Sequence, residues 1–273
     1  MDIDASGLTF ISDLVRTRAA IVLEPEKEYL VRARLEPIAK EEGFLSLNDL
    51  VSKLRIAPFG VLHKRVIDAM TTNETSFFRD VAPFDALKDV ILPELMKTRT
   101  ASKSLNFWCG ASSSGQEPYT VAILMKEQFP ELASWNIKFV ATDLSSKMVA
   151  RSQEGKYSQL EVNRGMPASL LMKYFTKKGM SWHVNEDLRK IFEFKEMNLI
   201  GQWLTFPKLD IVFLRNVLIY FDAETKKKRL GKIRQNLSPD GYLFLGGSET
   251  TLNLDEAFER VPVNGTSCYR LKK

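Results

Sequence analysis

Apolar residues recur at helical spacing through the first seventy residues, beginning with Leu8, Ile11, Leu14 and Val15. Ser46 precedes one such segment and has the side chain of a typical N-cap residue. Pro37 lies inside another and predicts a kink or a break there. No alternating strand pattern occurs in this region. We therefore expect an all-α domain over residues 1–70, followed by a linker or arm over residues 71–84.

The pattern changes after a further helix that is predicted to end near Lys97. Short apolar runs of strand length then alternate with helical segments, as in an open α/β sheet. The strand-like runs cover residues 105–109, 137–142, 191–195, 210–214, 242–245 and 268–271. Pro239, Asp240 and Gly241 predict a turn that leads into the fifth run. The periodicity fades between about 156 and 190, where we expect an inserted segment with small strands.

The first strand-like run leads into a small-residue loop with Gly110 and Gly115, and an apolar helical pattern follows. Strand, glycine turn and helix together are typical of the start of a nucleotide-type site. The spacing of the two glycines matches a P-loop, but Gln116 and Glu117 replace the Lys-Ser/Thr pair that binds phosphate. Glu117 would repel a phosphate and favour a cationic ligand such as S-adenosylmethionine. The alternative is a plain strand-to-helix turn of an α/β core.

Asp143 ends the second strand-like run, 28 residues after Gly115. Ligands of open α/β sheets bind beyond the carboxyl ends of the strands, and an acidic residue at the second strand end binds ribose hydroxyls. The position therefore favours a ligand-binding role for Asp143. The alternative is that Asp143 caps the helix predicted over residues 145–152.

Composition narrows the class of protein. The chain has 273 residues, 44% of them apolar, and no apolar run long enough to span a membrane. Its N-terminus has no signal-peptide core. The two cysteines, Cys109 and Cys268, fit no metal-binding spacing and no disulfide framework. We expect a cytoplasmic protein with no metal site and no membrane insertion. His63 and His183 have no sequence partners that indicate catalysis.

Charge is unevenly distributed along the chain. The net charge is +5, and residues 147–195 hold 10 Lys/Arg against 5 Asp/Glu. A local basic face indicates an acidic partner. No aromatic-rich motif accompanies the basic residues, so we expect no nucleic-acid partner.

Several motifs occur in a fixed order along the chain: TTNETSFFRD, WCGASSSGQEPYTVAI, ATDLSS, GKY, EMNL and DIVFLRNVLIYFD. Together they closely resemble the bacterial chemotaxis receptor methyltransferase family (CheR). The resemblance covers nearly the whole chain. It implies a class I methyltransferase fold over residues 85–273, that is, a Rossmann-like, mostly parallel sheet with an antiparallel edge. It also implies that residues 156–190 form an inserted β-subdomain and that the all-α domain precedes this fold.

The same resemblance implies an activity and a set of partners. The family transfers the methyl group of S-adenosylmethionine to glutamate side chains of chemotaxis receptors, leaving S-adenosylhomocysteine. The substrates would be the cytoplasmic domains of receptors. In some members the β-subdomain also binds the receptor's C-terminal peptide as an added strand. We expect the protein to act as a monomer.

Site residues follow from matching the family's motifs position by position. The cofactor-binding residues implied in this way are Asn73, Thr75, Arg79, Gly110, Glu117, Asp143, Asn198, Leu199, Arg215 and Asn216. Tyr220 matches a tyrosine near the transferred methyl group, and we assign Arg79 and Tyr220 catalytic roles in guiding the glutamate and orienting its oxygen. The alternatives are a surface arginine and a core tyrosine.

A glutamate with a pKa of about 4.3 is already ionised at pH 7, so the reaction needs no general base. Catalysis would depend on positioning and on desolvation of the carboxylate. Two other functions remain open from the sequence. One is a methyltransferase of the same fold that acts on an amine of another protein or on RNA. The other is a non-catalytic regulator that senses S-adenosylmethionine.

Overall fold

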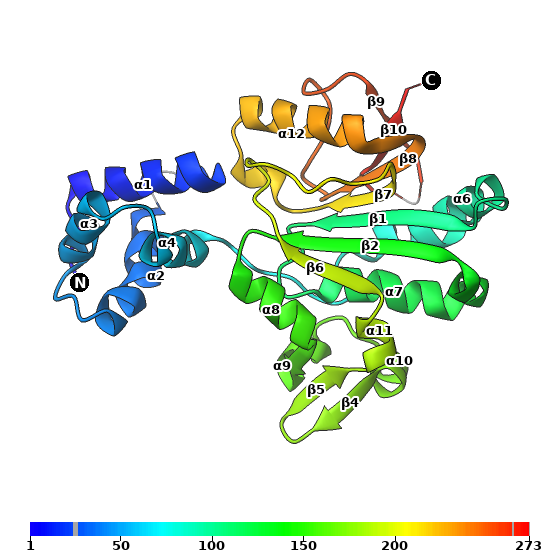
Figure 1. Cartoon of the computed structure of the whole chain (residues 1–273), viewed down its shortest axis with the longest axis horizontal. Helices are drawn as coiled ribbons and strands as arrows, with labels where there is room; N and C mark the ends of the chain where they lie inside the picture. The colour runs from blue at the N-terminus through cyan, green and yellow to red at the C-terminus, as the bar shows by residue number, and fades with distance from the viewer. Residues whose placement is uncertain (24–26, 264, 273) are drawn as a thin grey trace. The chain divides into compact units, whose positions relative to one another are not determined.

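The structure is a computed structural model of the chain, and it describes residues 1–23, 27–263 and 265–272. These residues form two compact units (Figure 1). The first contains residues 1–72 and 220–225, and the second contains residues 73–219 and 226–273. Of the helices in the described ranges, none combines the length and the apolar character that crossing a lipid bilayer requires.

The first unit is helical, as the sequence predicts. Its helices are α1 (Ala5–Ala19), α2 (Glu28–Glu41), α3 (Leu47–Ile56) and α4 (Val61–Met70). Ser46 is the N-cap of α3, because its hydroxyl accepts the Asp49 N–H while the Asp49 carboxylate accepts the Ser46 N–H. Pro37 does not break the helix, since α2 continues to Glu41, and the alternative prediction of a kink stays a prediction. Buried Leu35 and Ile38 flank Pro37 and hold this part of α2 in the helical core.

The second unit is built on a sheet whose described strands have the order β6-β2-β1-β7-β8-β10-β9. The strands from β6 to β8 pair in parallel, and β10 pairs antiparallel with both β8 and β9. This is the predicted mostly parallel sheet with an antiparallel edge. The strand bounds are β1 (Ser104–Gly110), β2 (Asn136–Asp143), β6 (Phe192–Glu196), β7 (Leu209–Leu214), β8 (Leu237–Leu245), β9 (Phe258–Val261) and β10 (Cys268–Leu271).

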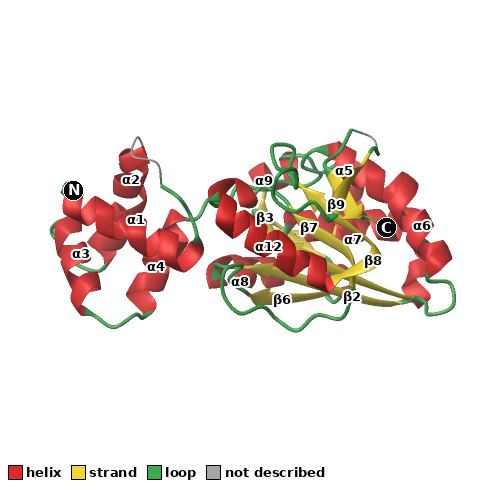
Figure 2. Cartoon of the chain, turned by 90° about the horizontal axis from the view of Figure 1, so that it is seen from above, coloured by secondary structure: helices red, strands yellow, loops and turns green. Residues whose placement is uncertain are grey.

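Helices lie on both sides of this sheet (Figure 2). The first helical segment, predicted to end near Lys97, is interrupted by the π-helix η2. Apolar side chains of η2 and α7 join those of β1 and β7 in one core cluster. The bounds are α5 (Val81–Ala86), η2 (Leu87–Ile91), α6 (Leu92–Thr98), α7 (Gln116–Gln128), η3 (Pro130–Ser134), α8 (Ser146–Glu154), η4 (Leu218–Tyr220) and α12 (Ala223–Asn236).

A smaller antiparallel sheet is inserted between α8 and β6. Its strand order is β3-β5-β4, with bounds β3 (Lys156–Ser158), β4 (Phe175–Lys178) and β5 (Ser181–Val184). The helices α9 (Gln159–Asn163), α10 (Ala168–Tyr174) and α11 (Glu186–Arg189) accompany it. Tyr157 of β3 is buried, and its hydroxyl donates a hydrogen bond of 2.7 Å to the carbonyl of Ser114. The insertion is therefore bonded to the loop that follows β1.

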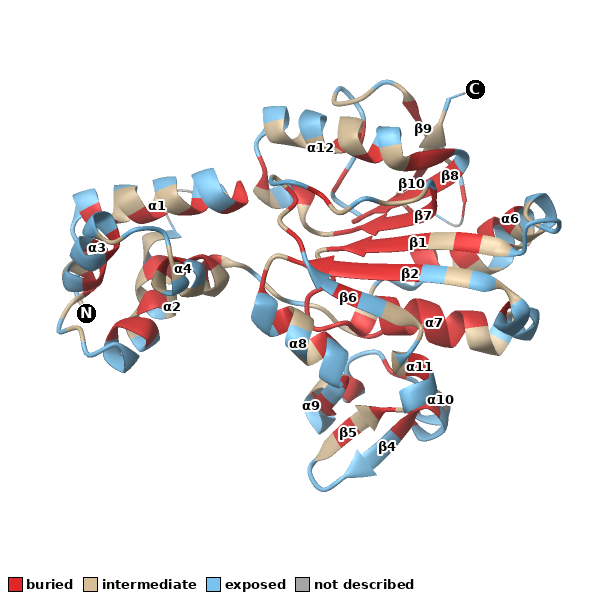
Figure 3. Cartoon of the chain, viewed as in Figure 1, coloured by how far each residue is buried: buried red, intermediate tan, exposed pale blue. Residues whose placement is uncertain are grey.

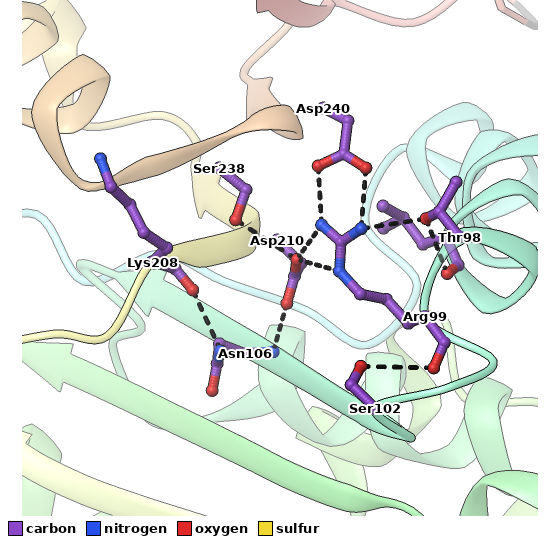
Figure 4. A network of polar contacts seen from close by, with 9 residues as sticks. Thr98, Arg99, Ser102, Asn106, Lys208, Asp210, Ser238 and Asp240 are labelled. Carbon is purple, nitrogen blue, oxygen red and sulfur yellow. Dashed lines mark hydrogen bonds and ion pairs between the residues drawn. The ribbon is translucent and has the colours of Figure 1, made fainter.

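The predicted turn at residues 239–241 is wrong, because these residues lie inside β8. The pairing of β7 with β8 shifts between Leu209 and Ile211, as at a β-bulge. Figure 4 shows the side chains that hold this region: Arg99 donates to both carboxylate oxygens of Asp240 (2.6 and 2.8 Å) and to Asp210 (2.7 Å). Gly241 fits there because a Cβ would lie 2.8 Å from the Leu209 carbonyl oxygen.

Burial is highest toward the carboxyl ends of the central strands (Figure 3). The last residues of β1 and β2 are buried, whereas the amino ends of both strands are partly exposed. Residues that follow these carboxyl ends thus lie where an open α/β sheet binds its ligands.

Candidate functional site

The loop between β1 and α7 is sterically restricted. A Cβ on Gly110 would lie 2.7 Å from Leu214 Cδ1 and 2.8 Å from the Trp108 ring. Gly115, the N-cap of α7, has a φ of 93°, which favours glycine. Ala111 and Ser113 also have positive φ values, of 54° and 49°. Such backbone strain persists only when the surrounding structure holds it, and it concentrates at functional sites.

Asp143 connects this loop to the end of β2. Its Oδ2 accepts the backbone N–H of Ser113 at 2.8 Å, and its Oδ1 accepts that of Ser145 at 2.9 Å. The N-cap of α8 is Ser145, so Asp143 is not the cap that the alternative interpretation required. Asp143 is 6% exposed. The carboxylate thus lies at the strand end, as predicted, and it fixes the loop as well.

Glu117 lies in the first turn of α7 between a thiol and a guanidinium. Its Oε1 accepts the Cys109 thiol at 3.2 Å, and its Oε2 accepts Arg215 Nη1 at 2.5 Å. Burial, and then the neighbouring Glu117, raise the pKa of the Cys109 thiol well above its usual value, which keeps the thiol protonated as a donor. Glu117 and Arg215 therefore form a mostly buried pair of opposite charges at the ends of β1 and β7.

Arg215 also binds the arm. Its Nη2 donates to Asp80 Oδ2 at 2.8 Å and to the Arg79 carbonyl at 3.1 Å. The arm residues Phe78 and Asp80 have positive φ values, of 50° and 57°. Arg215 Nε is buried and has no hydrogen-bond partner within the described ranges. Asp80 was not among the predicted site residues, although it is the last residue of the arm motif TTNETSFFRD.

The remaining arm residues bond to the loop and to one another. The carbonyl of Asn73 accepts the Ser113 hydroxyl at 2.8 Å. Arg79 Nη1 donates to the Glu74 carbonyl at 2.9 Å, so its guanidinium turns back along the arm. Thr75 is half-buried between them. The structure thus brings Asn73 to the glycine loop through its backbone, and it places the Arg79 backbone at Arg215.

Asn198 and Leu199 form a turn after β6. Asn198 Oδ1 accepts the Ile200 N–H at 3.0 Å. The carbonyl of Leu199 accepts Trp203 Nε1 at 2.7 Å and Arg229 Nη1 at 2.6 Å, and its side chain is buried. The backbone N–H of Met197, just before this turn, donates to the Asp143 carbonyl at 2.9 Å. The turn is therefore fixed beside the end of β2.

Asn216 follows Arg215 with a φ of 58°, and its backbone N–H donates to Glu249 Oε2 at 2.8 Å. Glu249 was not among the predicted site residues, although it ends a Gly-Gly-Ser-Glu segment that follows an apolar strand. Tyr220 closes the 3₁₀ turn η4, is half-buried and groups with the first unit. Its catalytic role stays a prediction.

The residues present fit S-adenosylmethionine better than a nucleoside triphosphate. Two carboxylates, Glu117 in the first turn of α7 and Asp143 at the end of β2, would repel phosphates. The amino-acid end of S-adenosylmethionine carries both an ammonium and a carboxylate. The charge of Glu117 is opposite to that of the ammonium, and the charge of the Arg215 guanidinium is opposite to that of the carboxylate.

Comparisons with known proteins agree with this chemistry. A family model described as "CheR methyltransferase, SAM binding domain" matches residues 73–266. A second, described as "CheR methyltransferase, all-alpha domain", matches residues 6–71. Together the two models cover most of the chain.

Curated relatives match over nearly their whole lengths. Chemotaxis protein methyltransferase Cher2 of Pseudomonas putida is 40% identical over 92% of this chain and 93% of its own. Chemotaxis protein methyltransferase 1 of Pseudomonas aeruginosa is 41% identical over the same shares of the two chains. The chemotaxis protein methyltransferase of Vibrio parahaemolyticus is 37% identical over 96% of this chain and 95% of its own.

Proposed function

Because this chain belongs to the CheR methyltransferase family, whose cofactor is S-adenosylmethionine, we propose that it methylates glutamate side chains of chemotaxis receptors. The relatives' names supply the chemotactic context. The arrangement of Glu117, Arg215 and Asp143 at neighbouring strand ends is the observation that supports a zwitterionic methyl donor most directly. The products would be glutamyl methyl esters and S-adenosylhomocysteine.

The residues that would hold the cofactor follow from the geometry above. Glu117 would accept hydrogen bonds from the ammonium group, and Arg215 would donate to the carboxylate. Asp143 would accept the ribose hydroxyls. When bound, S-adenosylmethionine supplies an activated methyl group on a sulfonium. The other predicted contacts, from Asn73, Thr75, Asn198, Leu199 and Asn216, belong to the same proposal.

The chain's own residues would act by positioning the acceptor. Arg79 guides the incoming glutamate by charge, and Tyr220 orients its oxygen by hydrogen bonding. Because the acceptor is ionised near neutral pH, no residue needs to remove a proton from it. The exclusion of water around the carboxylate raises its reactivity toward the methyl group.

The small sheet would bind the receptor's C-terminal peptide as an added strand. Strand β4 is at one edge of this sheet, with Thr176, Lys177 and Lys178 exposed, and lysine side chains suit an acidic peptide end. We also propose that the helical domain ends at residue 70, the arm at residue 84, and that the β-subdomain spans residues 156–190. The monomeric state and the cytoplasmic location stay predictions.

The experiment is incubation with methyl-labelled S-adenosylmethionine and purified receptor signalling domains, followed by mild alkali. Methyl esters release labelled methanol, whereas N-methyl groups survive. Label that resists alkali would favour an amine acceptor. Tight cofactor binding with no transfer to any receptor domain would favour a regulator that senses the cofactor.

A further inference from the structure

Glu249 is a buried carboxylate surrounded by backbone donors. Its Oε2 accepts the N–H groups of Gly246 at 2.6 Å and Asn216 at 2.8 Å. Its Oε1 accepts the N–H groups of Val217 at 2.9 Å and Ile219 at 3.2 Å. Glu249 is 6% exposed. Three of these donors belong to the turn after β7, which lies about thirty residues earlier in the chain than Glu249.

The surrounding backbone is shaped to fit this carboxylate. Asn216 has a φ of 58°, a left-handed conformation that is unfavourable without external support. A Cβ on Gly246 would lie 2.8 Å from Glu249 Oε2 and 2.7 Å from Asn216 Nδ2. Gly246 therefore allows the end of β8 to approach the turn after β7 closely enough for Glu249 to bond to it.

The turn that Glu249 holds carries predicted site residues. Arg215 begins it and pairs with Glu117, Asn216 is its second residue, and the N–H of Ile219 donates one residue before Tyr220. We propose that Glu249 is a positioning residue for methyl transfer: it fixes the turn that presents Arg215 and Asn216 to the cofactor. The effect on Tyr220 and on the acceptor glutamate rests on the proposed function.

A carboxylate is needed at position 249 because four backbone N–H groups point at this side chain. Each of its two oxygens accepts two N–H groups, and such charge-assisted bonds are stronger than neutral ones. Glutamine in the same place would offer a single acceptor oxygen, and its amide NH₂ would face two N–H donors. Buried donors without acceptors are costly. We therefore expect the turn to shift in Glu249→Gln.

Asp210 provides a matched control at the other end of β7. It is also a buried carboxylate that accepts a backbone N–H, from Asn106 at 2.8 Å, and it pairs with Arg99. It has no described bond to the site residues. Loss of Asp210 therefore tests the effect of destabilising β7 without moving the turn after it.

The experiment compares the wild type, Glu249→Gln, Glu249→Asp and Asp210→Asn as full-length proteins. Calorimetry gives the Kd for S-adenosylhomocysteine, and assays with receptor domains give kcat and the KM for S-adenosylmethionine. We expect Glu249→Gln to lose about 10- to 100-fold in kcat/KM, in line with the cost of a small misplacement at a site. The Kd of Glu249→Gln for S-adenosylhomocysteine should rise as well. Glu249→Asp, which keeps the charge, should recover part of both losses.

Asp210→Asn should lower the urea midpoint of unfolding but leave Kd and kcat/KM within about twofold of wild type, since it leaves the site in place. A folded Glu249→Gln with wild-type Kd and kcat/KM would overturn the proposal. If that variant does not fold, Gly246→Ala displaces the same turn and should show the same losses. If neither variant folds, Glu249 serves folding alone and the proposal fails.

Failure of the proposed function would appear differently. A wild-type protein that forms no methyl ester on receptor domains refutes the glutamate acceptor. The Kd for S-adenosylhomocysteine still reports on Glu249 in that case, because it needs no acceptor.

Discussion

Arg215 and Glu117 form an ion pair of 2.5 Å that joins the end of β7 to the first turn of α7. The arginine side chain is 1% exposed and the glutamate side chain 14% exposed, so solvent screens the pair weakly. Asp80 of the arm shares the guanidinium at 2.8 Å. Three segments that are far apart in the sequence thus converge on one buried cation.

Glu117→Gln should weaken binding of S-adenosylhomocysteine by about 10- to 100-fold, which is the equivalent of losing one hydrogen bond to a charged group. The amide would no longer balance the ammonium or Arg215. Calorimetric titration measures the change. Glu193→Gln, which alters an exposed glutamate on β6, should bind like wild type. Equal Kd values for wild type and Glu117→Gln would remove Glu117 from the cofactor site.

Arg79→Ala and Tyr220→Phe should lower kcat on receptor domains by about tenfold or more, because each loses a group that orients the acceptor. Single-turnover assays with labelled cofactor separate this step from product release. The Kd for the cofactor should change less in Tyr220→Phe than in Arg79→Ala. Near-normal rates in both variants would end the catalytic assignment of these two residues.

The pH profile should identify the acceptor. For a glutamate with a pKa of about 4.3, kcat/KM should be nearly flat between about pH 6 and pH 9. For a lysine, whose pKa is about 10.4, it should rise about tenfold per pH unit over the same range. Initial rates in buffers of constant ionic strength test this. A steep rise would favour the amine acceptor.

Tyr157→Phe should weaken cofactor binding by about threefold and cost about 1 kcal/mol of stability, since one hydrogen bond is lost. Burial raises the pKa of Tyr157 well above its usual value, so its hydroxyl remains a donor to the Ser114 carbonyl. Tyr242→Phe also loses one hydrogen bond, to the Glu94 carboxylate, away from the loop. It should lose stability without affecting the Kd. Equal effects on the Kd would mean that the bond from Tyr157 does not shape the loop.

Asp240 should contribute stability only above its folded-state pKa. The hydrogen bond from Arg99 lowers the pKa of Asp240, while partial burial opposes the shift. Because an unfolded aspartate has a pKa of about 3.9, the contribution is complete above that pH. It is lost as the pH falls through the lower folded-state value. Urea unfolding of wild type and Asp240→Asn should therefore differ more at pH 6 than at pH 3. A difference in unfolding free energy between the two proteins that does not change with pH would contradict this prediction.

The sequence predicted the parts of the site that depend on local pattern. Gly110 ends a strand, Gly115 and Glu117 lie at the start of the helix that follows it, and Asp143 ends the next strand, so their positions follow from the α/β pattern alone. Their roles as ligand-binding residues stay a prediction. The order of the motifs along the chain was also sufficient to predict the family, which the family models confirm.

The predicted turn that failed, and the missed residues Asp80 and Glu249, depend on partners that are distant in the sequence. Pro239 to Gly241 have the composition of a turn, but Arg99, 141 residues from Asp240, holds them inside β8. The described partners of the Glu249 carboxylate are backbone N–H groups, so no side-chain spacing in the sequence indicates them. Such groups occur at nearly every residue and leave no trace in a sequence.

A carboxylate fixes strand β7 at each end. At its start Asp210 accepts the Asn106 N–H in the network of Figure 4, and after its end Glu249 accepts the Asn216 N–H. Side chains of a strand alternate between the two faces of its sheet, so a slip of β7 by one residue would exchange the two faces. Such a slip would break the bond from Asn106 to Asp210 at one end and the bonds to Glu249 at the other. The two anchors thus select a single alignment of β7, the one that directs Arg215 toward Glu117.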